Sequence, residues 1–134
     1  MNTSVKVSFY WLLIAFGLVL QSNIELMQRV FFSVEVNNAS GAEGIPTPVH
    51  ILFLVSMIIP AIFSFLNTKL SENKIFLWLS IVYAILLLII NVYHFIADGI
   101  SDLSNISKII TLLFVPIINA FLVFELFQLR KGNK

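Results

Sequence analysis

The chain has 134 residues, of which 59% are hydrophobic and 11% are charged, and its formal net charge is +1 at pH 7. Soluble domains usually have about 25% charged residues, so this composition excludes an ordinary water-soluble globule and indicates a membrane protein. The near-neutral charge excludes a generally basic nucleic-acid-binding protein. The chain has no cysteine, which excludes disulfides, cysteine-ligated zinc, iron–sulfur clusters and thiol catalysis.

Four apolar segments are long enough to cross the ~30 Å hydrocarbon core of a bilayer as helices, at about 1.5 Å per residue. They predict membrane-spanning helices at residues 7–28, 48–67, 74–98 and 104–128. The predicted fold is therefore all-α, an antiparallel four-helix transmembrane bundle that forms one domain over the whole chain. The longest connection, 29–47, is expected to run over one end of the bundle, either as a simple tether or as a lid.

Local residue patterns also predict where some of these helices begin and end. Thr47 before Pro48 is typical of an N-cap followed by a first-turn proline. The pair Asp98-Gly99 is typical of a helix stop, and Ser104 is a suitable cap for the last helix. We therefore expect the second helix to start near Thr47 and the third helix to end near Gly99.

The distribution of basic residues predicts which end of the bundle faces the cytoplasm, because Lys and Arg in short loops resist translocation. Arg29 and Lys108 fall on the side that holds the long loop. The other basic residues fall on the side that holds both termini: Lys6, Lys69, Lys74, Arg130, Lys131 and Lys134. Both termini are therefore expected to be cytoplasmic. This predicts a multi-pass protein of the cell membrane, which in a bacterial host is the inner membrane.

Polar residues inside each predicted span recur at helical spacing, which gives every span one polar face. Such faces converge at the centre of an antiparallel bundle. Counted along the helices at about 1.5 Å per residue, several ionisable residues fall within roughly 8 Å of the outer membrane surface. These residues are Glu25, His50, His94, Asp98 and Lys108. In the inner half, Ser64 and Glu125 are almost the only polar residues, so we do not expect a continuous polar pore.

Two imidazoles and two carboxylates at this common depth predict a metal site, and we call these residues the predicted ligand set: Glu25, His50, His94 and Asp98. His94 and Asp98 are spaced i, i+4, which stacks them on one face of an α-helix. Neutral imidazole combined with carboxylate suits zinc, iron or manganese. Other polar residues are expected to orient the ligands or to line the pocket beneath them: Gln21, Asn91, Thr111 and Asn119.

Two other interpretations of these residues stay open. Polar side chains at the end of a span cost little free energy, so a His94–Asp98 pair is also consistent with a purely structural link. Alternatively, His50 and His94 on facing helices would reach one plane as the two axial ligands of a haem. The sequence alone does not decide between these interpretations and the metal site.

Short signatures near the ends of three spans point to a resemblance. They are Asn23-Ile24-Glu25 in the first span, Pro48-Val49-His50 at the start of the second, and Tyr93-His94 followed by Asp98 in the third. With these signatures the chain resembles small uncharacterised four-span bacterial membrane proteins, and its Ile-, Asn- and Lys-rich composition is similar to that of Bacteroidota sequences. The resemblance implies a membrane fold and no particular activity.

The leading functional hypothesis is a membrane binding or accessory protein, and not an enzyme, whose outward-facing polar pocket holds a metal ion or a small polar ligand. Alternatives are a dimeric proton-coupled transporter that uses Glu25, similar in size to the small multidrug-resistance transporters, and a membrane metal-dependent hydrolase in which Glu25 or Asp98 activates water. A packing subunit of a larger membrane complex is a further alternative. The expected partners are the lipid bilayer and either a second copy of the chain or a membrane complex, with no nucleic acid.

Overall fold

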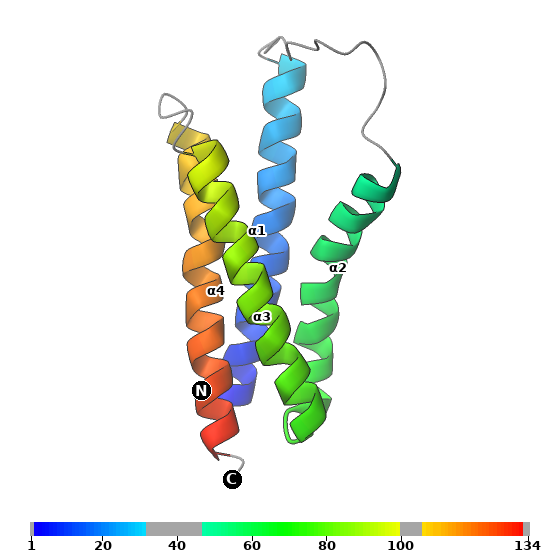
Figure 1. Ribbon diagram of the computed structural model, residues 1–134, viewed down its shortest axis with the longest axis vertical. Helices are drawn as coiled ribbons and strands as arrows, with labels where there is room; N and C mark the ends of the chain where they lie inside the picture. Colours follow the sequence, from blue (N-terminus) through cyan, green and yellow to red (C-terminus); the bar gives the residue numbers. More distant parts are fainter. Residues whose placement is uncertain (1, 32–46, 100–105, 133–134) are drawn as a thin grey trace.

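Figure 1 shows the computed structural model, which describes residues 2–31, 47–99 and 106–132. These residues form four α-helices and one π turn: α1 (Thr3–Phe31), α2 (Thr47–Leu70), α3 (Lys74–His94), η1 (Phe95–Gly99) and α4 (Ile106–Gly132). No β-strand occurs in these ranges, so the all-α prediction is confirmed for them. Side chains are described throughout except at 25–31, 47–54, 98–99 and 107.

The helices are longer than the predicted spans at several ends. α1 begins at Thr3, before the predicted start at residue 7, and α2 extends to Leu70, beyond the predicted end at residue 67. α2 begins at Thr47, as the Thr47-Pro48 pair predicted. The predicted cap Ser104 and most of the loop 29–47 lie outside the described residues.

Three helices are long and apolar enough to cross a membrane, over Thr3–Ile24, Lys74–Ala97 and Lys108–Gly132. In α2 the stretch with described side chains, Val55–Leu70, is apolar but shorter than the 18 residues that a membrane-spanning helix is taken to need. The complete α2 helix has 24 residues, which corresponds to about 36 Å of helical rise. Helices of sufficient length and hydropathy are therefore confirmed for three of the predicted spans, whereas their insertion in a membrane and the span in α2 stay predictions.

The four helices lie side by side, and successive helices run in opposite directions (Figure 1). α1 packs against both α2 and α4, and α3 packs against α4. Direct contact between α2 and α3 is the least extensive, and the N-terminal half of α2 leans away from the other helices. The two termini lie at one end, which we call the terminal end, so α1 ends and α2 begins at the opposite end.

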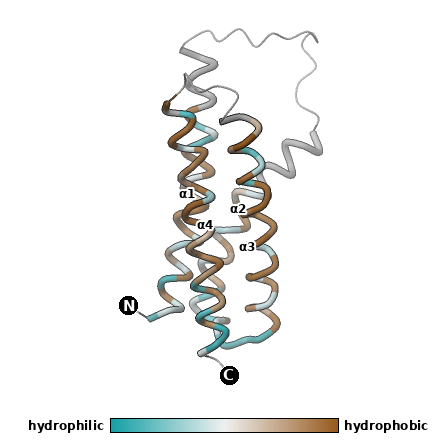
Figure 2. The backbone as a smooth tube through the Cα atoms, turned by 60° about the vertical axis from the view of Figure 1, so that its left-hand side comes forward, coloured by the Kyte–Doolittle hydropathy of each residue, from teal (hydrophilic) through white to brown (hydrophobic). Residues whose placement is uncertain are grey.

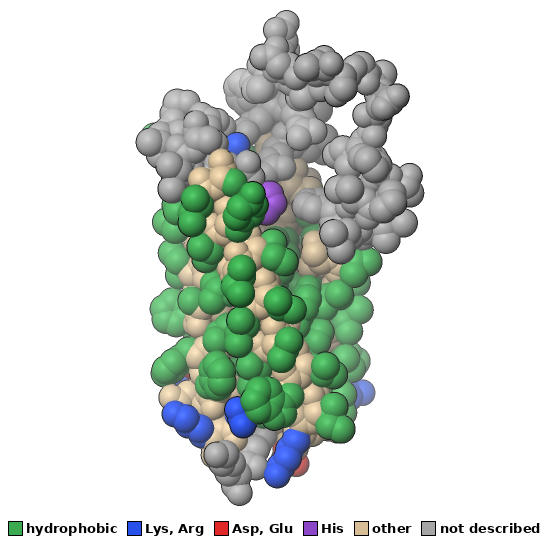
Figure 3. All heavy atoms as spheres, in the orientation of Figure 1, with side chains coloured by type: hydrophobic (Ala, Val, Ile, Leu, Met, Phe, Trp, Pro, Cys, Tyr) green, Lys and Arg blue, Asp and Glu red, His purple; other side chains and the backbone are tan. Residues whose placement is uncertain are grey.

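A core runs along the axis of the assembly because each helix has one face of large apolar residues at helical spacing. Its fully buried members include Trp11 and Ile14 on α1, Ile81 on α3, and Leu122 and Leu126 on α4. The helices are apolar over most of their length (Figure 2), and large apolar side chains are also exposed on the outside, as the green surface in Figure 3 shows for the visible face. Helices that are apolar on both faces are expected where the surrounding solvent is lipid.

Two local features fix neighbouring helices. At Gly17, α1 approaches α4 so closely that an added Cβ atom would lie 2.8 Å from Cγ2 of Val115. Between α2 and α3 the chain turns within 71–73, and the Asn73 side chain caps α3 by accepting hydrogen bonds from the backbone N–H groups of Ile75 and Phe76, both at 3.0 Å.

Candidate functional site

Only one member of the predicted ligand set has a described side chain. His94 is the last residue of α3, and its side chain is exposed. The side chains of Glu25, His50 and Asp98 lie outside the described residues. Among the side chains that the structure does describe, no group of three His, Asp or Glu is arranged to hold a metal ion. The predicted metal site therefore stays a prediction.

The backbone between His94 and Asp98 differs from the expected α-helix. Phe95–Gly99 forms a π turn, in which hydrogen bonds join residues i and i+5, and this turn ends at Gly99, where the Asp98-Gly99 pair predicted the helix to end. The i, i+4 stacking expected for His94 and Asp98 assumed α-helical geometry, so it does not apply unchanged across this turn. Single π turns inside helices occur frequently at functional sites.

The residues expected beneath the predicted ligand set lie mostly in the interior. Asn91 is 8% exposed and Thr111 is 9% exposed, whereas Asn119 is fully buried and Gln21 is half-buried. The Asn91 side-chain nitrogen is buried and has no hydrogen-bond partner among the described residues. In the amide orientation that satisfies both of its polar atoms, Asn119 donates to the Ala84 carbonyl at 3.3 Å and accepts from the Leu88 N–H at 2.8 Å. Asn119 therefore joins α4 to α3, whereas the side-chain NH₂ group of Asn91 donates to none of the described residues.

A second polar region lies near the terminal end, and we call it the serine–asparagine layer: Ser4, Ser8, Ser64, Asn67 and Ser80. The Ser64 hydroxyl donates to the Ser8 carbonyl at 2.8 Å. The Asn67 amide nitrogen lies 2.7 Å from the Ser4 carbonyl oxygen and 3.0 Å from Ser8 Oγ. Asn67 and Ser80 are fully buried, and among the described residues Asn67 Oδ1 and Ser80 Oγ have no hydrogen-bond partner.

The serine–asparagine layer corrects the expectation that the inner half contains little polar besides Ser64 and Glu125. Ser4 precedes the predicted span 7–28, but α1 already begins at Thr3, and the Ser4 hydroxyl contacts the Asn67 carbonyl of α2. The available signal was the spacing, because Ser4 and Ser8 are i, i+4 on one helix and Ser64 and Asn67 are i, i+3 on the next. Small polar residues at such spacing are typical of close helix–helix contacts in membranes.

An ion pair lies beside this layer and joins α1 to α4. Lys6 Nζ is 3.3 Å from Glu125 Oε1. The Glu125 side chain is 14% exposed and the Lys6 side chain is 39% exposed, so the carboxylate is the more enclosed partner. Glu125 therefore depends on Lys6 for neutralisation.

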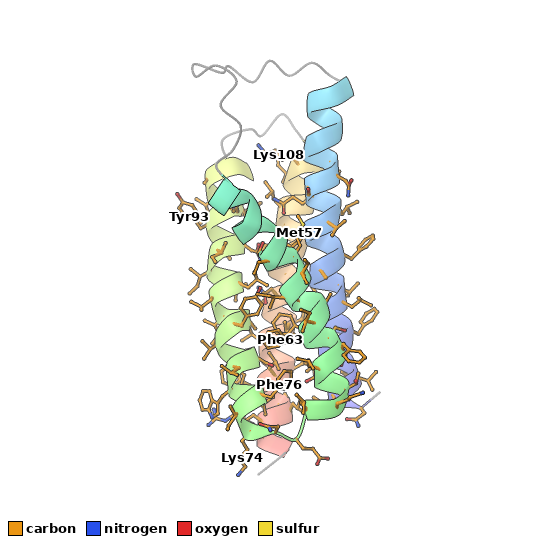
Figure 4. All side chains as sticks on the ribbon, turned by 90° about the vertical axis from the view of Figure 1, so that its right-hand side faces the viewer. Met57, Phe63, Lys74, Phe76, Tyr93 and Lys108 are labelled. Carbon is orange, nitrogen blue, oxygen red and sulfur yellow. The ribbon has the colours of Figure 1, made fainter. Side chains whose placement is uncertain are left out.

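Aromatic rings fill the space between α1, α2 and α3 near this layer. The Phe63 ring stacks on Tyr83 at 5.3 Å and on Phe76 at 5.5 Å, and Trp11 lies 5.7 Å from Tyr83. Figure 4 shows Phe63 on α2 close to Phe76 on α3. The indole nitrogen of Trp11 and the hydroxyl of Tyr83 are buried and have no hydrogen-bond partner in the part of the chain that the structure describes. Because the rings occupy the space between them, this cluster is a packing element and not a ligand cage.

Comparison of the chain with protein-family models, curated proteins and solved structures gave no match.

Proposed function

We propose that this chain is a multi-pass protein of the cell membrane that binds a divalent metal ion or a small polar ligand at the end away from its termini. In this proposal α1 to α4 form an antiparallel transmembrane bundle with both termini in the cytoplasm. The predicted ligand set supplies the ligands, and Asn91 supports them from below. The protein acts as a binding or accessory protein of the membrane.

The apolar surface and the distribution of charge support the membrane part of this proposal. Described basic residues gather at the terminal end: Lys6, Lys69, Lys74, Arg130 and Lys131. Figure 3 shows Lys and Arg side chains at this end of the visible face, below a broad hydrophobic band. Lys108 is the only described basic side chain on the far side of that band. The asymmetry agrees with a cytoplasmic terminal end.

The pairing of residues across helices supports depths within about one helical turn of each other for the predicted ligand set. Gly17 faces Val115 between α1 and α4, and Asn119 faces Ala84 and Leu88 between α4 and α3. Because neighbouring helices are antiparallel, each step back along α4 corresponds to a step forward along α1 and α3. Counted in this way from the two pairings, Thr111 of α4 lies at about the level of Gln21 on α1 and His94 on α3. The Ser8–Ser64 pairing between α1 and α2, continued in the same way, brings His50 to about the same level. Glu25 then lies about one turn further out, and Asp98 follows His94 by four residues within the π turn.

The observation that carries the proposal is the buried side-chain nitrogen of Asn91, which has no hydrogen-bond partner among the described residues. Asn91 lies three residues before His94, on the face of α3 that packs inward. A buried donor without a partner costs about 1–3 kcal/mol, and an acceptor bound beside Asn91 would remove that cost. A carboxylate that binds a metal ion, or a polar ligand with acceptor oxygens, supplies that partner.

Metal analysis of the detergent-purified protein tests the proposal. We expect bound zinc, manganese or iron in the unmodified protein, and an increase in melting temperature when the metal is added back after chelation. His50→Ala and His94→Ala should each lose the metal and the increase. Asn23→Ala is the matched control, because Asn23 is an exposed polar residue of α1 that bonds its own backbone at Val19. Absence of metal, with no response to any of the three ions, would refute metal binding.

A second candidate function is proton-coupled transport that uses Glu25. The serine–asparagine layer and Glu125 favour it, because they supply polar groups in the half of the membrane where the sequence predicted almost none. Proteoliposomes loaded with a pH-sensitive dye should then show proton movement that Glu25→Gln abolishes and Asn23→Ala does not. Equal proton movement in all three proteins and in empty liposomes would exclude this candidate.

A further inference from the structure

An arginine and a tryptophan stack on each other where α3 and α4 meet at the terminal end. The guanidinium carbon of Arg130 lies 3.9 Å from the centre of the Trp78 ring. Trp78 is 49% exposed, so the stacked pair faces outward and not into the core. A cation over an aromatic face gains about 0.5–2 kcal/mol, which holds the guanidinium at a fixed place on the surface.

Lys74 lies next to this pair. It begins α3 and is spaced i, i+4 from Trp78, so both residues share one face of the helix. The pairing of Asn119 with Ala84 and Leu88 brings Arg130 to about the level of Lys74 on the neighbouring helix. We call Lys74, Trp78 and Arg130 the headgroup site.

The positive charge of the headgroup site is not neutralised by described acidic residues. Glu125 is paired with Lys6 on the side where α4 meets α1. Glu72 lies in the turn before α3, and neither it nor any other described carboxylate forms an ion pair with Lys74 or Arg130. Two cations beside a tryptophan therefore present donors to an anion from outside the protein.

The surface beyond Trp78 indicates which anion this is. Val82 and Leu86 follow Trp78 in steps of four, so they continue the same face of α3 toward the middle of the span. They are 51% and 53% exposed, and no charged residue interrupts this face. A lipid with its phosphate at Lys74 and Arg130 would thus lay its acyl chains on the apolar strip of Val82 and Leu86. A free phosphate ion has no acyl chain and would gain nothing from this strip.

We propose that the headgroup site binds an anionic phospholipid of the cytoplasmic leaflet, with the phosphate at Arg130 and Lys74 and an acyl chain along Val82 and Leu86. Anionic lipids are concentrated in that leaflet, and each basic residue near it adds about 1 kcal/mol of attraction. This inference rests on the membrane insertion that the proposed function includes, but not on the metal or ligand site at the other end.

Native mass spectrometry of the purified protein with added phosphatidylglycerol or phosphatidylcholine tests the site. We expect preferential retention of phosphatidylglycerol by the unmodified protein and about a thirtyfold weaker retention in the double variant Lys74→Gln/Arg130→Gln, since each basic residue contributes about 1 kcal/mol. Lys69→Gln/Lys108→Gln is the charge-matched control and should retain the lipid. Arg130→Lys keeps the charge but loses the planar guanidinium, so it should show an intermediate loss.

Equal losses in the test and control variants would overturn the proposal, because they would show attraction by overall charge and not by a site. Displacement of the lipid by millimolar inorganic phosphate would also overturn it, since the apolar strip would then contribute nothing. If membrane insertion itself is wrong, the protein will remain soluble without detergent and no variant will retain lipid. That result is distinguishable from the loss of lipid preference in a protein that still requires detergent.

Discussion

Asn67 of α2 donates from one amide nitrogen to two residues of α1, the Ser4 carbonyl at 2.7 Å and the Ser8 hydroxyl at 3.0 Å. These three residues belong to α1 and α2, two helices whose residues are mostly apolar. In lipid, apolar surfaces do not drive helices together as they do in water, so hydrogen bonds and close packing become the main specific links. The Asn67–Ser8 link therefore defines how α1 and α2 are matched along their length.

Replacing Asn67 with Leu should destabilise the protein by about 1–2 kcal/mol, because the hydroxyl of Ser8 and the carbonyl of Ser4 lose a buried donor. The measurement is reversible unfolding in a mixed detergent system, followed by circular dichroism. Thr68→Leu is the control, since Thr68 is exposed and bonds only to the Phe65 carbonyl of its own helix. An equal loss in both variants would show that the buried link contributes nothing specific.

Gly17→Ala should destabilise the packing of α1 on α4. The added methyl group would lie 2.8 Å from Val115 Cγ2, and overpacking of this kind costs about 1–3 kcal/mol, more than the gain in helix propensity. Gly132→Ala serves as the control because a Cβ there meets nothing within 4 Å. The double variant Gly17→Ala/Val115→Ala should recover part of the loss, and no recovery would contradict the close approach of these two residues.

Lys6→Met should be more harmful than Glu125→Gln, since removal of the lysine leaves a carboxylate that is only 14% exposed without its counter-charge. The coupling energy between the two residues should be about 0.5–1 kcal/mol and should fall as salt is added, because Lys6 is partly open to solvent. A double-mutant cycle in detergent at low and high salt measures this energy. Additive effects of the two substitutions would contradict the ion pair.

Tyr83→Phe should leave stability unchanged or raise it slightly, because the buried hydroxyl has no hydrogen-bond partner and its removal ends a desolvation cost. The ring that stacks on Phe63 and Trp11 is kept. Tyr83→Leu removes this stacking and should cost about 1–3 kcal/mol. Thermal unfolding compares the three proteins, and clear destabilisation by Tyr83→Phe would show that the hydroxyl has an acquired partner such as a bound water.

The sequence predicted the helical class and the main apolar segments, because long apolar runs have few alternatives in a membrane. It also predicted Ser64 as polar in the inner half but not its partners. Ser4 lies before the apolar run, and a hydropathy argument gives no reason to extend the helix over it. The π turn after His94 was not predictable either, since Phe95–Gly99 continues an α-helical pattern in which no residue type demands a wider turn. The predicted roles of Glu25, His50 and Asp98 stay predictions.

The sparse contact between α2 and α3 has a mechanical consequence. Phe63 provides the aromatic contacts of α2 with α3, and the turn capped by Asn73 ties the two helices together at the terminal end. α1, α4 and α3 are in contact in that order without needing α2. An outward tilt of α2 about its tied end would separate it from α3, where contact is least extensive, and would leave the contacts of α4 with α1 and α3 in place.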